Sequence, residues 1–162
     1  MRALLIAEGN LLRRDDGAAH EILHQLELER LSAVPEETVP DVESRALLQL
    51  TPEMAEEMAG YDAVIFMDAD VGAIDLSVDP INPIDKQRSP PALSHISRPA
   101  DIVGLARALF GFAGRAFLCR IPAHDLSCGE GMSPRTSALA AQAAAKIETL
   151  LRELRAEPGK RV

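Results

Sequence analysis

The chain has 162 residues, 47% of them hydrophobic, which suits a single domain with a substantial core that we expect to span residues 1–157, followed by a flexible tail at 158–162. Its formal net charge of −8 disfavours binding to nucleic acid or to an anionic membrane surface, because both attract basic proteins. No apolar run approaches the ~20 residues of a membrane span. The two cysteines form no CxxC pair, which fits a reducing cytoplasm with free thiols. We also expect a monomer.

The first half of the chain alternates strand patterns with helix patterns. Apolar runs of strand length predict buried strands, and apolar residues three to four apart predict helices. For the second helix, Thr51 is expected as the N-cap, Pro52 in the first turn and Gly60 after the last turn. The expected elements are a strand at 2–7 (RALLIA), a helix from Asp16 to about Arg30, a strand at 41–48, a helix at 51–60 and a strand at 63–69 (AVIFMDA).

The second half is less regular. The alternating segment 73–79 predicts an edge strand, and the four prolines of 80–91 predict an irregular surface loop. Further on we expect a helix at 98–111 capped by Ser97, a buried strand at 115–122 (RAFLCRIP), and a helix that opens at Ser133-Pro134 and ends before Pro158. This alternation predicts an α/β fold: a three-layer αβα sandwich with a mostly parallel, twisted sheet and helices on both faces.

Three polar side chains lie just past strand ends or in neighbouring loops: Asp16 after the first strand, Asp68 at the end of the third, and His95 in LSHIS. The carboxyl ends of parallel strands meet at one edge of a sheet, where sites gather. Two carboxylates and an imidazole suit a borderline divalent metal and leave coordination positions open. Each residue also has a purely structural explanation, since Asp15 or Asp16 could cap a helix, Asp68 could bind amides of its own turn and His95 could be an ordinary loop residue.

Several other chemistries lack their motifs. The sequence contains no HExxH, no DTG or DSG triplet and neither a GxGxxG nor a P-loop. We therefore expect no zincin-type or pepsin-type protease and no tightly bound organic cofactor. Cys119 lies inside an apolar strand and is most simply a core residue, whereas Cys128 with His124 is a minor alternative as a thiol nucleophile.

A receiver-like phosphoacceptor signalling module is an alternative from another functional class. It too has a paired acid near the first strand and an aspartate at the end of the third. That fold needs its acidic pair directly at the strand end and a lysine at the end of the fifth strand. Here Asp15 lies several residues past the turn, and FLCRIPAH contains no lysine.

Four motifs, in order along nearly the whole chain, resemble those of the [NiFe]-hydrogenase maturation proteases. GNLLRRDDG resembles the family's N-terminal pattern, roughly GxGN-x-L-x-x-D-[DE]-G, and VIFMDA resembles its third strand. SHISRPADIVGLARALFG resembles the segment in which a histidine precedes a helix, and GEGMSPRTSAL the opening of the final helix. QLTPEMAEEMAGYDAVIFMDA is especially similar to the branch that serves cytosolic bidirectional, NAD(P)-linked hydrogenases.

The resemblance implies an endopeptidase that removes the C-terminal extension of a nickel-loaded hydrogenase large-subunit precursor. The precursor is the implied partner, and its nickel, bound transiently, would be recognised through two carboxylates and a histidine. Carried onto this chain, those positions are Asp16, Asp68 and His95, with Asp15 capping the helix or supporting its neighbour. The same residues are thus implied as the catalytic and metal-binding group.

The sequence departs from the family pattern at three places. Ala7 and Ala19 stand where the pattern has glycines, and LLQLT stands where many members have a Gly-Gly-Thr loop linked to cleavage. A family member that binds metal or partner without cutting is therefore a further alternative.

Overall fold

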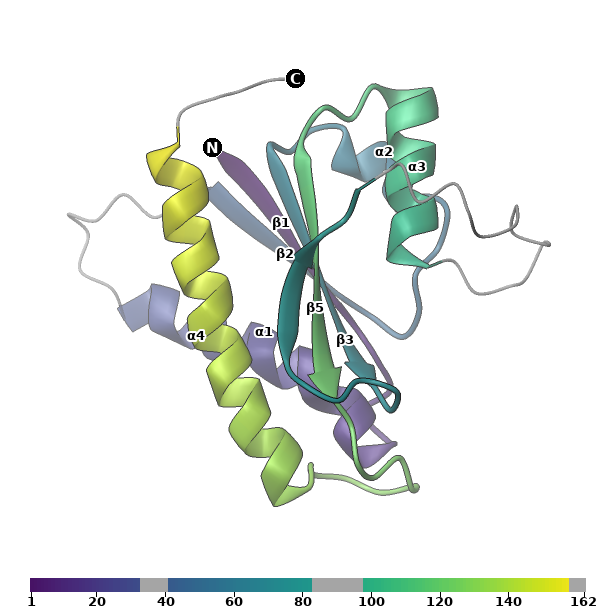
Figure 1. The fold of residues 1–162 in the computed structure, drawn as a ribbon, viewed down its shortest axis with the longest axis vertical. Helices are drawn as coiled ribbons and strands as arrows, with labels where there is room; N and C mark the ends of the chain where they lie inside the picture. Colours follow the sequence, from purple (N-terminus) through teal and green to yellow (C-terminus); the bar gives the residue numbers. More distant parts are fainter. Residues whose placement is uncertain (33–40, 83–97, 158–162) are drawn as a thin grey trace.

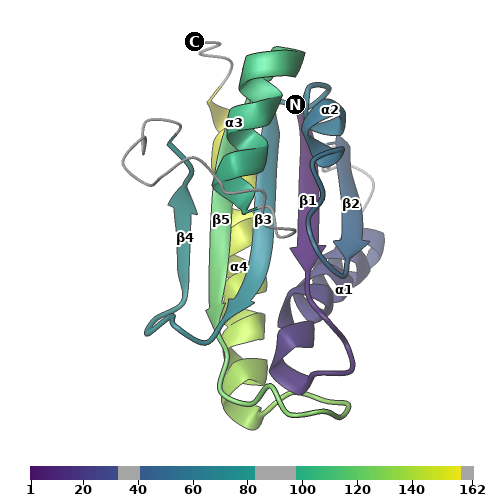
Figure 2. The same ribbon diagram turned by 90° about the vertical axis from the view of Figure 1, so that its right-hand side faces the viewer.

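The computed structural model describes residues 1–32, 41–82 and 98–157, which contain a five-stranded sheet in the order β2-β1-β3-β5-β4 (Figures 1 and 2). Strand β4 runs antiparallel to β5, and the other neighbouring strands are parallel. The strands are β1 (Arg2–Glu8), β2 (Asp41–Leu47), β3 (Ala63–Asp70), β4 (Ser77–Pro80) and β5 (Arg115–Pro122). The helices are the 3-10 turn η1 (Arg14–Gly17), α1 (Ala18–Ser32), α2 (Met54–Met58), α3 (Pro99–Phe110) and α4 (Pro134–Ala156).

Helices cover both faces of the sheet, as predicted for an αβα sandwich (Figure 2). On one face, side chains of α1 and α4 pack against alternate residues of the central strands, among them Leu5 and Ile65. On the other face, α2 and α3 pack against the intervening residues, among them Ile6 and Phe66. The core therefore has two layers, one on each side of the sheet.

The three strands that the apolar runs identify as buried occupy the interior of the sheet. They are β1, β3 and β5, and β5 has the predicted bounds of 115–122. The more polar β2 and β4 lie at the two edges, which confirms the expected edge strand near 73–79. None of the helices within the described ranges is long and apolar enough to span a bilayer.

The helix ends agree with the sequence in part. Ser133 caps α4 as predicted, because its side chain accepts a hydrogen bond from the amide of Thr136. The helix expected at 51–60 is much shorter: α2 spans only five residues, and Glu53 rather than Thr51 occupies its N-cap position, without a side-chain bond. Residue Arg98 holds the cap position of α3, and Ser97 lies outside the described residues, as does the tail 158–162.

The strand order bears on the receiver-like alternative. Receiver-type sheets have parallel strands in the order 2-1-3-4-5. Here the fourth strand is antiparallel and takes the outer position, while the fifth lies beside β3. The fold therefore does not support a receiver module. It does bring the carboxyl ends of β1, β2, β3 and β5 to one edge of the sheet, called here the carboxyl edge, which lies at the bottom of Figure 2.

Candidate functional site

A tight loop after β1 returns the chain to the carboxyl edge. Gly9 has a φ of +151°, and a Cβ built on it would lie 1.9 Å from the carbonyl oxygen of Asp16, so only glycine fits there. The loop is held further by the amide of Asn10, which donates to Oδ2 of Asp16 at 2.9 Å. The carbonyl of Gly9 lies 2.8 Å from Nε2 of His20. Asp16 is therefore placed next to the end of β1, partly buried.

Neither aspartate of the adjacent pair caps the first helix, which corrects the structural explanation considered for them. The cap position of η1 is Arg13, and no side chain caps that turn. The carboxylate of Asp16 accepts a bond from the loop amide of Asn10 instead. The two neighbours differ in exposure, since Asp15 is completely buried and Asp16 is not.

Asp15 anchors the loop after β1 to the distant start of α4. Burial alone would raise the pKa of its carboxyl, but hydrogen bonds from Ser133, His124, Thr136 and Asp125 outweigh that effect and hold the pKa well below its usual range. The carboxylate is therefore ionised, and donors of the protein itself satisfy its hydrogen bonding. Its donors are the amides of His124 (2.8 Å), Asp125 (2.9 Å) and Ser133 (2.7 Å) and the hydroxyls of Ser133 (2.9 Å) and Thr136 (2.8 Å).

Asp68 lies at the carboxyl end of β3, on the α2/α3 face. Side chains alternate along a strand, and Phe66 belongs to the core layer of that face, so Asp68 projects to the same side. Burial raises the pKa of Asp68 to about 7, helped by the negative charges of Glu8, Asp70 and Asp16, against a lowering by the Ala69 amide. The carboxyl is thus poised to change its charge near neutral pH.

Glu8 and Asp70 are two carboxylates of this region that the sequence analysis did not single out. Glu8 ends β1 on the same face as Asp68, because Ala7 pairs with Met67 and the following residues project to the other side. Burial raises the pKa of Glu8, opposed by a hydrogen bond from the Leu50 amide. In the sequence, Glu8 is visible only as an acid at the end of an apolar strand. That Glu8 lies near Asp68 follows from the strand register.

His95 lies outside the described residues, so its predicted convergence with Asp16 and Asp68 stays a prediction. Within the described part of the chain, no group of three His, Cys, Asp or Glu side chains is arranged to hold a metal. The charges of Asp16 and Asp68 do act on each other at the carboxyl edge. The helix that follows His95 in sequence, α3, packs on the face that carries Asp68.

Carboxylates cluster at the carboxyl edge, and among the residues that the structure describes no basic side chain pairs with Asp16, Asp68 or Glu8. Like charges near one another favour the protonated form, and a bound cation would reverse that preference. Partly buried Asp16, Asp68 and Glu8 are therefore suited to contact a cation that arrives with a partner molecule. A carboxyl with a pKa of about 7, such as Asp68, also suits a general base at neutral pH.

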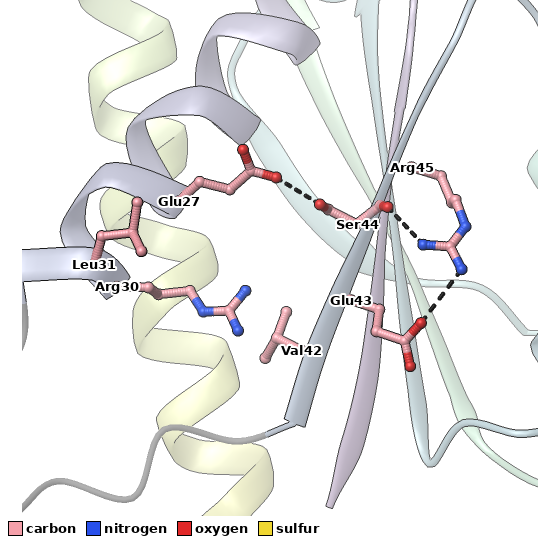
Figure 3. Close-up of a pocket in the computed structure, with 7 residues that line it drawn as sticks. All are labelled: Glu27, Arg30, Leu31, Val42, Glu43, Ser44 and Arg45. Atoms are coloured by element: carbon pink, nitrogen blue, oxygen red, sulfur yellow. Dashed lines mark hydrogen bonds and ion pairs between the residues drawn. The ribbon is translucent and has the colours of Figure 1, made fainter. Parts of the chain in front are cut away.

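A groove elsewhere on the surface makes a poorer candidate. It lies between α1 and the first half of β2, has a volume of about 530 Å³, and is lined by residues that include Glu27, Ser44 and Arg45 (Figure 3). Its polar groups pair with each other: the Ser44 hydroxyl donates to Glu27 at 2.5 Å, and Arg45 donates to Glu43 at 3.3 Å. The groove lies toward the opposite end of β2 from the carboxyl edge.

The raised pKa of Asp68 predicts a pH-dependent free energy of unfolding. Its folded-state pKa of about 7 exceeds the ordinary 3.8, so its contribution is fully present below pH 3.8 and is lost as the pH rises through 7. Asp68→Asn cannot ionise and should be more stable than wild type at pH 8 by about 2 kcal/mol, below the limit of ~4 kcal/mol that the pKa difference sets. Urea unfolding at pH 5 and pH 8 measures this.

The matched control is Asp75→Asn, since Asp75 is exposed in the turn after β3. It should leave the difference in stability between pH 5 and pH 8 as it is in wild type. An Asp68→Asn variant that loses stability from pH 5 to pH 8 as steeply as wild type would contradict the assigned pKa.

No protein-family model and no curated protein matches the sequence. Solved structures do match it over nearly the whole chain. The hydrogenase maturating endopeptidase HybD from E. coli is 21% identical, with 94% of this chain and 93% of that chain covered and a TM-score of 0.66. The [NiFe] hydrogenase maturation protease HycI from Thermococcus kodakarensis KOD1 is 21% identical, with 93% and 92% covered and a TM-score of 0.64.

A further match is the solution structure of an endopeptidase from Escherichia coli. It is 23% identical, covers 94% of this chain and 93% of that chain, and has a TM-score of 0.69. At these identities the likeness concerns the fold. The chain therefore has, over nearly its whole length, the fold of the [NiFe]-hydrogenase maturation proteases.

Proposed function

We propose that this protein is an endopeptidase that removes the C-terminal extension of a nickel-loaded [NiFe]-hydrogenase large-subunit precursor. The observation that carries the proposal is the group of carboxylates at the carboxyl edge, in which burial, together with the charges of Glu8, Asp70 and Asp16, raises the pKa of Asp68. Neighbouring carboxylates repel one another, and a bound proton or a bound cation relieves that repulsion. The full-length fold likeness and the sequence motifs indicate which cation-bearing partner to test.

In this proposal, Asp16, Asp68 and His95 bind the nickel carried by the precursor. Carboxylate and imidazole together suit nickel, a borderline metal. His95 precedes Arg98 by three residues, which span at most ~10 Å, and Arg98 occupies the N-cap position of α3, the helix on the Asp68 face. The N-terminal end of α3 also points toward the carboxyl edge, because the helix leads through a short loop into the start of β5 (Figure 2).

The chemical step is hydrolysis of a peptide bond next to the recognised metal. Nickel held by the precursor and these ligands can polarise the scissile carbonyl or lower the pKa of a water molecule. A carboxylate of the site then serves as the general base that takes a proton from the attacking water. Asp15 takes no part in this step, because its carboxylate is buried and occupied by hydrogen bonds. It supports Asp16 by anchoring the loop between β1 and α1.

The segment from Leu50 to Asp68 favours one branch of these proteases. Its motif, LTPEMAEEMAGYDAVIFMD, forms α2 and β3 beside the candidate site, and it resembles the enzymes that serve cytosolic bidirectional, NAD(P)-linked hydrogenases. We therefore propose the large subunit of such a hydrogenase as the partner.

Incubation of the purified chain with nickel-loaded precursor tests the activity. We expect the precursor to shorten by one discrete C-terminal piece, as read by mass spectrometry. Binding of the precursor without shortening would instead identify a non-cleaving family member, the second candidate that the departures at Ala7 and Ala19 keep open. Labelling of Asp68 by acetyl phosphate would favour a phosphoacceptor.

A further inference from the structure

Exposed apolar side chains gather around the carboxyl edge. Ten large hydrophobic residues are exposed among the residues that the structure describes, and five of them lie in the three loops that follow β1, β2 and β3. Loops of this kind usually carry polar side chains, so this concentration needs an explanation. The five, with the exposed fraction of each residue, are Leu11 (60%), Leu12 (62%), Leu48 (68%), Val71 (66%) and Ile74 (88%).

The loop that carries Leu11 and Leu12 is held in place by backbone hydrogen bonds. The amide of Leu12 donates to the Asn10 side chain at 2.9 Å, and its carbonyl accepts from the Gly129 amide at 2.9 Å. The amide of Arg14 donates to the Gly129 carbonyl at 3.1 Å. The exposure of the two leucines is therefore part of the folded structure, and a partner would find them already ordered, which lowers the entropic cost of binding.

The turn after β3 is ordered in the same way. The side chain of Asp70 accepts from the Gly72 amide at 2.7 Å, and its carbonyl accepts from the amides of Ala73 and Ala123 at 3.3 Å and 3.1 Å. Val71 and Ile74 stand on this turn. Because it leads from β3 to the edge strand β4, while Leu48 follows the opposite edge strand β2, the apolar residues are spread across the whole sheet (Figure 2).

The surface is wide, and it surrounds the acids of the candidate site. From β2 to β4 there are four strand spacings, or about 19 Å at ~4.8 Å each. An extended peptide of about six residues can reach across this width along one line, whereas a folded protein also covers the acids between the loops. The acids Asp16, Asp68 and Glu8 lie among the same loops, so the partner must present a positive centre within an apolar surface.

We propose that Leu11, Leu12, Leu48, Val71 and Ile74 form a docking surface for the folded body of the precursor, in addition to the carboxylates that meet its metal. This inference rests on the proposed function and names its substrate class. The substrate is a folded protein whose metal centre is surrounded by apolar residues, and not a free C-terminal peptide. Binding buries the five side chains and excludes water from the carboxylates, which strengthens their attraction to a cation.

The test is the double variant Leu12→Ser with Ile74→Ser. We expect KM for the nickel-loaded precursor to rise about tenfold or more, because two apolar side chains no longer become buried on binding. The melting temperature should stay within about 2 °C of wild type, since both side chains are exposed in the free protein.

The matched control is Leu31→Ser with Leu109→Ser. It removes two leucines that are about as exposed as the tested pair, 84% and 68%, from the ends of α1 and α3 that lie away from the carboxyl edge. It should leave KM unchanged. Equal KM values in the two double variants would overturn the docking surface while the proteolytic function stands. Failure of the wild-type chain to process the precursor would instead overturn the proposed function. A wild-type dimer that the test variant dissociates, with KM unchanged, would assign the surface to a second copy of this chain.

Discussion

Asp15→Asn should lower the free energy of unfolding by about 3 kcal/mol, the largest effect on stability that we expect from a single polar substitution. The carboxylate is completely buried and accepts five hydrogen bonds. An asparagine offers one oxygen. If that oxygen takes the place of Oδ2, the amide nitrogen faces the backbone N–H of Ser133, so donor meets donor and a buried group loses its partner.

The neighbouring Asp16→Asn provides the control, because that carboxylate is partly exposed and accepts a hydrogen bond from the amide of Asn10. It should cost no more than about 1 kcal/mol. Urea unfolding followed by circular dichroism measures both variants. If the two substitutions cost the same, Asp15 is not the anchor that its contacts indicate.

The stabilisation by Asp15 should depend on pH in a defined direction. Its folded-state pKa lies below the ordinary value of 3.8, so its contribution is present above pH 3.8 and is lost as the pH falls through the folded-state pKa. The difference in stability between wild type and Asp15→Asn should therefore be constant from pH 5 to pH 8. It should shrink only below about pH 4.

Asp16→Ala, Asp68→Ala and His95→Ala should each lower precursor processing by roughly a hundredfold or more, because each is proposed to contact the metal at the reacting centre. Asp16 lies in η1 and Asp68 near the end of β3, both outside the core clusters, so those two variants should remain folded. The rate of cleavage of nickel-loaded precursor, measured with a circular dichroism spectrum of each variant, separates the two effects.

Glu29→Gln serves as the control, since Glu29 is an exposed carboxylate on α1. It should process the precursor at the wild-type rate. A His95→Ala variant with full activity would remove the histidine from the site, and a fully active Asp16→Ala variant would remove the motif aspartate.

The fold could be predicted from local sequence to a large extent. The apolar runs of β1, β3 and β5 identify the central strands because a strand buried on both faces carries apolar residues in succession. The start of α2 shows the limit of such patterns. Thr51 and Pro52 are typical of a helix start, yet the chain forms turns there and the helix begins at Met54.

The candidate site could be predicted only in part, because its contacts join residues that are distant in sequence. The partners of Asp15 lie 109 to 121 residues further along the chain, which no local motif reveals. Glu8 looked like the end of an apolar strand until the pairing of β1 with β3 placed it beside Asp68. The motif did identify Asp16 and Asp68, whose charges interact in the fold.

The central claim is that carboxylates at the carboxyl edge recognise the nickel that a precursor carries. The most direct measurement compares cleavage of one large-subunit precursor in its nickel-loaded and nickel-free forms by the same wild-type protein, with mass spectrometry as the readout. We predict that the loaded form loses a single C-terminal piece and that the nickel-free form stays intact. Cleavage of both forms at equal rates would contradict the claim.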